Sequence, residues 1–101
     1  MNTTLTSIKG VRVGNSTHLD KLTGCTLIVF DKPTLTSFKA FGGAVASYNT
    51  TAIQNGSNDI KVHGIFLTGG STYGLGAVGE INKYLVEHDV FSQTYTMKNI
   101  F

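Results

Sequence analysis

The 101 residues are enough for one domain, and only 14% of them are charged, with eight basic and six acidic side chains. The basic residues are scattered rather than clustered, which argues against nucleic-acid binding, and no apolar run reaches the roughly 20 residues that cross a bilayer. Cys25 is the single cysteine, which excludes an internal disulfide. We expect a cytoplasmic protein with no nucleic-acid or membrane partner, whose low charge indicates a surface partly covered by another chain.

The first third of the chain predicts two strands joined by a loop. Residues 8–13 alternate weakly and end at Gly14, as in a short strand, and residues 15–24 are polar, as in a loop. Residues 25–30 form a compact β-branched and aromatic run, which predicts a central strand. Cys25 opens this strand, and we expect its side chain to be buried and reduced.

The segment after this strand has the composition of a turn. Residues 31–33, Asp-Lys-Pro, predict a turn, so residues 34–41 are expected to form a strand that pairs back on residues 25–30 as a hairpin. Gly42 and Gly43 then break the strand. Residues 44–56 are expected to hold a short helix, closed by an Asn-Gly pair.

The clearest pattern lies between residues 62 and 90. Residues 62–68 are an apolar strand that contains His63, Gly69 and Gly70 form a turn, and Ser71 is placed to cap the following helix. The helix presents one apolar face, made of Leu75, Val78, Ile81 and Leu85. We assign residues 1–90 to a single domain and residues 91–101 to a divergent tail.

Three glycines at the start of this helix, Gly74, Gly76 and Gly79, each cost about 1 kcal/mol relative to alanine. We interpret them as positions where another backbone approaches so closely that a Cβ would clash. Their G-x-G-x-x-G spacing resembles a dinucleotide fingerprint, but the strand ends too early and the acidic ribose ligand is missing about 20 residues on. The spacing therefore favours helix packing.

The turn itself carries the candidate chemistry. Gly69, Gly70, Ser71 and Gly74 resemble a nucleophile elbow with one glycine out of place, and capping remains the simpler role for Ser71. Backbone amides at a helix start can hold a carboxylate, a phosphate or a developing oxyanion. We therefore take these four residues as a candidate substrate-binding turn. The histidines are too far apart in sequence to predict a metal site.

Several blocks occur in an order that resembles the N-terminal part of the L-aminopeptidase/D-esterase family. The most specific is the run from His63 to Leu75, which contains Leu-Thr-Gly-Gly-Ser-Thr-Tyr-Gly-Leu. The others are Gly10-Val-Arg-Val-Gly14, Thr23-Gly-Cys-Thr26, Gly42-Gly43 and Tyr84-Leu85.

The sequence predicts an α/β fold of the α+β sandwich kind. The resemblance implies that it is part of a four-layer αββα sandwich, similar to the aminopeptidase/ornithine-acetyltransferase type of architecture. It also implies a self-processing hydrolase in which a freed N-terminal serine or threonine attacks peptides, amides or esters, without metal or organic cofactor. That nucleophile belongs to the second half of the family and has no counterpart in residues 1–101, so we expect no catalytic residue here. Two hypotheses follow: a fragment or subunit completed by a second chain, or a catalytically silent homologue that oligomerises and binds a small peptide or anion at Gly69 to Ser71.

Overall fold

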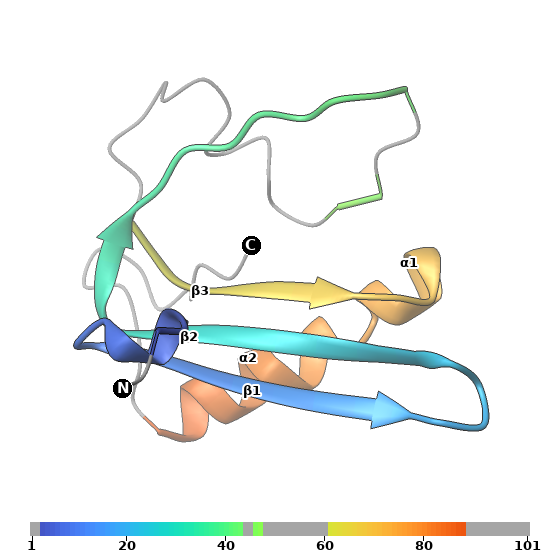
Figure 1. Ribbon diagram of the computed structural model, residues 1–101, viewed down its shortest axis with the longest axis horizontal. Coiled ribbons are helices and arrows are strands. Elements are labelled where there is room, and N and C mark those ends of the chain that lie inside the picture. The colour runs from blue at the N-terminus through green and yellow to red at the C-terminus, as the bar shows by residue number, and fades with distance from the viewer. Residues whose placement is uncertain (1–2, 44–45, 48–60, 89–101) are drawn as a thin grey trace.

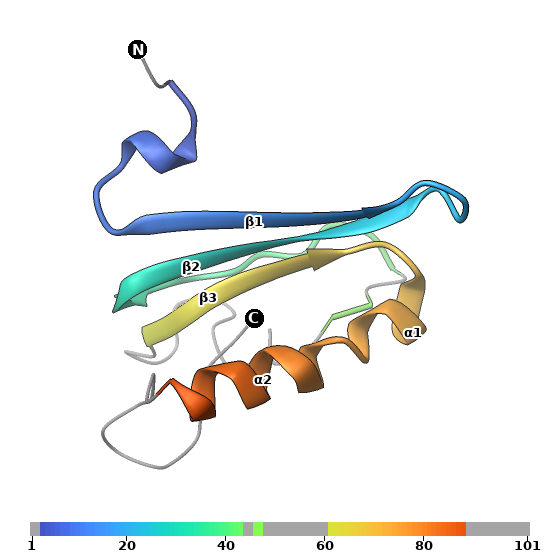
Figure 2. The ribbon, with the colours of Figure 1, turned by 90° about the horizontal axis from the view of Figure 1, so that it is seen from below.

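The computed structural model describes residues 3–43, 46–47 and 61–88. In chain order they form a 3-10 helix (Leu5–Ser7), β1 (Val11–His18), β2 (Thr23–Leu35), β3 (Lys61–Thr68), α1 (Ser71–Leu75) and α2 (Val78–Glu87). The strands make an antiparallel sheet in the order β1-β2-β3, and α2 runs along one face of it (Figures 1 and 2). One β layer and one α layer give the α+β class that the sequence predicts. None of the described helices is long and apolar enough to cross a membrane.

β1 and β2 form a long hairpin. They pair continuously from Val11 opposite Phe30 to His18 opposite Thr23, and the four residues between them close the turn. Leu22 lies in the left-handed region at φ 50°, and its amide donates to the Leu19 carbonyl over 3.3 Å. The predicted loop over residues 15–24 is confirmed only at residues 19–22, because residues 15–18 belong to β1 and residues 23–24 to β2. The polar residues outside 19–22 belong to strands because backbone pairing, rather than apolar burial, holds this exposed end of the sheet.

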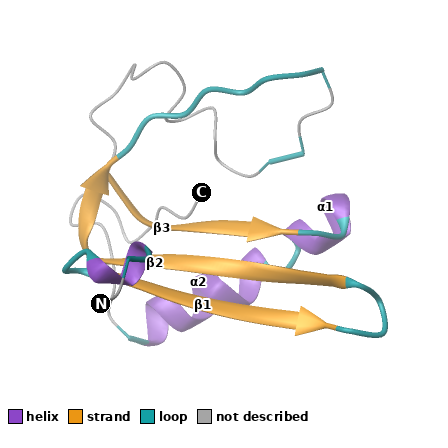
Figure 3. Cartoon of the chain, in the orientation of Figure 1, coloured by secondary structure: helices purple, strands orange, loops and turns teal. Residues whose placement is uncertain are grey.

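The predicted turn at residues 31–33 is also wrong, because β2 continues through it to Leu35. The pairing of β2 with β3 shifts register between Val29 and Thr34, and β2 changes direction there (Figure 3). Such an irregularity tolerates Pro33, which has no N–H to donate to a regular ladder. β2 pairs with β1 and β3, so the expected hairpin with residues 34–41 does not form. Most of the predicted helix over residues 44–56 lies outside the described residues.

The core lies between the sheet and α2. Val62, Val78 and Leu85 are buried, and Phe66 and Ile81 pack against the helix side chains. This arrangement confirms the strand over residues 62–68 and the apolar face of the helix. The helix is interrupted between Leu75 and Val78, which the apolar spacing alone does not predict.

Two polar side chains in the sheet behave differently. His63 is 2% exposed at the start of β3, as expected for a structural histidine in a buried strand. Cys25 has a free thiol but is only half-buried, like the other residues from 24 to 30 of β2, so the expectation of a buried side chain is only partly met.

The glycines of the helical segment are not equivalent. A Cβ on Gly74 would overlap the carbonyl oxygen of Gly69, which confirms the predicted close approach of a second backbone segment. A Cβ on Gly79 would meet nothing within 4 Å among the described residues, so the prediction is wrong there as far as these residues show. Gly74 is thus required by packing, whereas Gly79 has room for a side chain.

These two glycines give opposite predictions for stability. Gly79→Ala should raise the free energy of unfolding by about 0.5–1 kcal/mol, because alanine is the better helix former. Gly74→Ala should lower it by about 1–3 kcal/mol, because the added methyl overlaps backbone. Urea unfolding of both variants measures the difference. Changes of the same sign in the two variants would contradict the placement of Gly74 against Gly69.

Candidate functional site

The turn made by Gly69, Gly70 and Ser71 leads from β3 into α1. Gly70 has φ 85° and Ser71 has φ 56°, so two consecutive residues lie in the left-handed region. For serine this conformation costs roughly 1–2 kcal/mol. Gly70 is the N-cap of α1, and no side chain caps the helix. The predicted capping role of Ser71 is therefore wrong, because the left-handed turn moves the helix start so that Ser71 becomes its first residue.

Three hydrogen bonds fix this turn. The Gly69 amide donates to the Gly24 carbonyl over 3.0 Å, and the Gly74 amide donates to the Gly70 carbonyl over 3.0 Å. The Thr68 hydroxyl donates to the Gly69 carbonyl over 2.9 Å. The amides of Gly70 and Ser71 donate to no acceptor among the described residues. The turn thus presents two adjacent amides that can bind a ligand oxygen.

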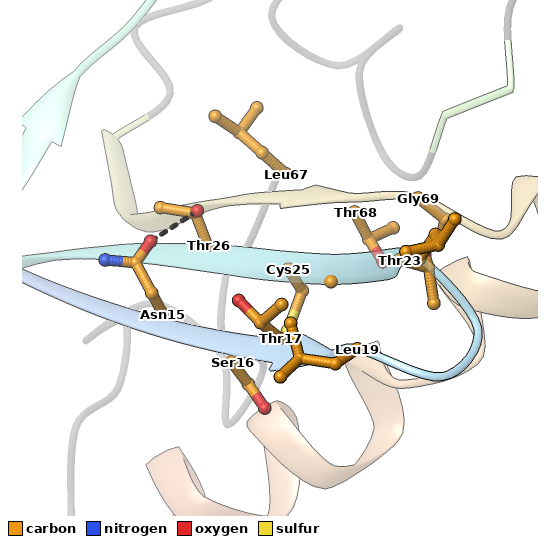
Figure 4. A pocket seen from close by; sticks show the side chains of 12 residues that line it. Asn15, Ser16, Thr17, Leu19, Thr23, Cys25, Thr26, Leu67, Thr68 and Gly69 are labelled. Atoms are coloured by element: carbon orange, nitrogen blue, oxygen red, sulfur yellow. Dashed lines mark hydrogen bonds between the residues drawn. The ribbon is translucent and has the colours of Figure 1, made fainter.

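A hollow of about 700 Å³ lies beside the turn, where the hairpin end of β1 and β2 meets the end of β3 (Figure 4). Of the four predicted site residues, only Gly69 lines the hollow; Gly70, Ser71 and Gly74 follow directly in the turn and α1. The lining residues are Asn15, Ser16, Thr17, Leu19, Leu22, Thr23, Gly24, Cys25, Thr26, Leu67, Thr68 and Gly69.

The lining is mostly apolar in surface, with several polar groups, and its described residues carry no acid, base or formal charge. It offers hydroxyls from serine and threonine, the Asn15 amide and the Cys25 thiol, with leucines as its apolar part. The Thr26 hydroxyl donates to the Asn15 side-chain oxygen over 2.6 Å, which joins β1 to β2 at the hollow (Figure 4). No lining residue is an aspartate, glutamate, histidine, lysine or arginine. The hollow can therefore hydrogen-bond a ligand, but its own side chains supply no general base for a hydroxyl nucleophile.

Sequence reasoning missed the β1 side of this hollow. Asn15, Ser16 and Thr17 fall in the segment predicted as a loop, and Thr26 was assigned to the central strand and to a family block but not to a site. The charged pair Asp20 and Lys21, which suits a turn and lies between the β-branched residues Thr17 and Thr23, is the signal that could have indicated a hairpin.

The histidines do not join the site. His18 accepts a hydrogen bond from the Lys21 amide over 3.3 Å in the hairpin turn, and His63 is buried in β3. His88 lies at the end of α2, where its ring stacks on Tyr84 and its Nδ1 lies 2.8 Å from the Tyr84 carbonyl oxygen. In the part of the chain that the structure describes, no three His, Cys, Asp or Glu side chains gather as metal ligands would.

Comparison with protein-family models gives a match over nearly the whole chain. The sequence model of peptidase family S58 matches residues 3–100. The match includes residues 91–100, and the domain boundary placed at residue 90 stays a prediction. Searches among curated proteins and among solved structures found no significant match.

The contact between the turn and the hairpin can be tested by a double-mutant cycle. A Cβ on Gly69 would lie 2.5 Å from the Thr23 hydroxyl oxygen. Gly69→Ala should therefore lower the free energy of unfolding by about 1–3 kcal/mol, and Thr23→Ala should relieve most of this loss. Denaturant unfolding of the two single variants and the double variant measures the coupling. Strictly additive effects would show that the turn does not rest on Thr23.

Proposed function

Since the chain belongs to peptidase family S58, the L-aminopeptidase/D-esterase family, we propose that it forms the N-terminal part of an N-terminal-nucleophile hydrolase. The family assignment makes the chain a peptidase-like hydrolase by descent. The finer proposal is that it acts on N-terminal residues of peptides, amides or esters together with a segment that carries the nucleophile. We place this assembly in the cytoplasm.

The family match carries the proposal, and the described lining of the hollow is compatible with it. This lining offers Ser16, four threonine hydroxyls and the Cys25 thiol, but no carboxylate, imidazole or amine to activate them. An N-terminal nucleophile needs no such side chain, because its own α-amine accepts the proton from its hydroxyl as that oxygen attacks the carbonyl carbon. A hollow whose described residues offer hydroxyls among apolar surface, without charge or base, suits a site in which the nucleophile arrives on another segment.

Within this proposal, Gly69, Gly70, Ser71 and Gly74 form a substrate-binding turn. The amides of Gly70 and Ser71 have no acceptor among the described residues, so they can donate to a substrate carbonyl or to the oxyanion that forms on attack. Gly69 lines the hollow, and Gly74 has no Cβ that would overlap the Gly69 carbonyl oxygen, so α1 can pack against the turn. The chemistry proposed requires no metal or organic cofactor.

One alternative is supported by the same observations. A homologue without its nucleophile would keep the hollow and the paired amides, and would bind a small peptide or anion at Gly69, Gly70 and Ser71 without hydrolysing it. Such a protein would form oligomers of this chain alone. The two proposals differ in the partner that they require.

Mass spectrometry of the protein isolated from its native cells distinguishes them. Denatured samples give covalent lengths, and native samples give the assembly. We expect a second polypeptide that begins with serine or threonine, together with hydrolysis of amino-acid anilides. An assembly of intact 101-residue chains alone, without hydrolysis, would support the silent homologue.

The role of the turn is tested on the isolated assembly. Gly70→Val should lower kcat/KM for an amino-acid anilide by about tenfold or more, because valine disfavours φ 85° and the amides would move. Gly43→Val is the matched control, since a Cβ there meets nothing within 4 Å among the described residues. Equal losses in both variants, or no loss in Gly70→Val, would contradict a substrate-binding turn.

A further inference from the structure

β1 forms one edge of the described sheet, and its hydrogen-bonding direction can be read from one bond. The Asp31 amide donates to the Gly10 carbonyl over 2.8 Å, so these two residues are a hydrogen-bonded pair of the hairpin. Backbone groups of successive strand residues point alternately to the two sides. The N–H and C=O groups of Val11, Val13, Asn15 and Thr17 therefore point away from β2.

Among the described residues, this outer row is open along most of its length. The Val11 amide donates to the Ile8 carbonyl over 3.2 Å, and the other outward backbone groups of β1 have no partner among the described residues. Natural sheets protect long edges with proline, lysine or bulges. β1 contains no proline or lysine and pairs with β2 without a register shift. Its one formal charge, Arg12, is paired with Asp31 at 3.0 Å.

We propose that this edge binds the same edge of a second copy of the chain. The two β1 strands pair antiparallel about a two-fold axis at Gly14, and two three-stranded sheets join into one continuous six-stranded sheet. Such an interface is isologous, so every contact occurs twice. It is independent of the proposed hydrolase activity.

The register follows from the outward groups. With Gly14 on the axis, Val13 faces Asn15 of the second copy and Val11 faces its Thr17. This register forms six hydrogen bonds between the two copies, because the Val11 amide of each copy is already bonded to Ile8. An axis at Val13 forms four, because the occupied Val11 amide falls inside the ladder. An axis at Asn15 also forms six, but it sets Arg12 opposite His18.

The Gly14 register has two further advantages. Arg12 faces Ser16 of the second copy, so no like charges oppose each other. Gly14 itself occupies a pair without hydrogen bonds, where facing Cα atoms come within about 4.5 Å. No side chains meet at this axis, and a Cβ on Gly14 would meet nothing within 4 Å among the described residues of its own copy. Substitutions at Gly14 therefore act on the interface and leave the described fold of one copy unchanged.

Charges introduced at Gly14, on the proposed axis, test the proposal. We expect sedimentation and native mass spectrometry of the 101-residue chain to show dimers of the 10.8 kDa protein. Gly14→Lys and Gly14→Glu should each raise the dimer Kd by about tenfold or more, because the two copies place like charges opposite each other. An equimolar mixture of the two variants should restore dimers, and these should be heterodimers by mass.

Two controls keep the test decisive. Gly43→Lys and Gly43→Glu add the same charges at a position with open space and should leave the dimer Kd unchanged. Val13→Pro removes an outward N–H and should also yield monomers while β1 and β2 remain paired. The proposal would be overturned by a monomeric native chain, or by a dimer Kd in both Gly14 variants equal to that of the unsubstituted protein. It would also be overturned if the Asn15 and Thr17 amides were protected from hydrogen exchange only when a second polypeptide is present.

Discussion

The hydrogen bond from the Gly69 amide to the Gly24 carbonyl ties the end of β3 to the start of β2. It is the last rung of the ladder that holds the central strand between its two neighbours, and it fixes where the chain leaves the sheet. The left-handed turn, the close approach of Gly74 to Gly69 and the direction of α1 all follow from that exit point. The hollow lies beside the same rung, so fold and candidate site share one constraint.

The sequence predicts elements well where side-chain burial decides the structure. The strand over residues 62–68 and the helix face with Val78 and Leu85 form the core, and their apolar periodicity was correctly interpreted. Prediction failed where backbone pairing decides. The polar residues of β1 and the Pro33 segment of β2 lie in strands because a neighbouring backbone supplies their hydrogen bonds, and composition carries little information about that neighbour.

The candidate site was also predicted only in part. The turn was found from Gly69 and Gly70, because a glycine pair after an apolar strand reports a backbone conformation directly. The hydroxyls that surround the hollow come from β1 and β2, and only the hairpin register brings them next to Gly69. The helix cap was misassigned since a left-handed serine is uncommon, and capping statistics assume an ordinary helix start.

The pairing of β2 with β3 also has a consequence for the order of folding. β1 and β2 are joined by a four-residue turn, whereas Cys25 and Thr68 meet only after a long intervening segment closes into a loop. Short loops close faster and at lower entropic cost. We expect the hairpin to form first and the Gly69 turn to form in the final step, which pulse-labelled amide exchange would reveal as late protection of Gly69. The candidate site would then be the last part of the domain to form and the first to be lost on partial unfolding.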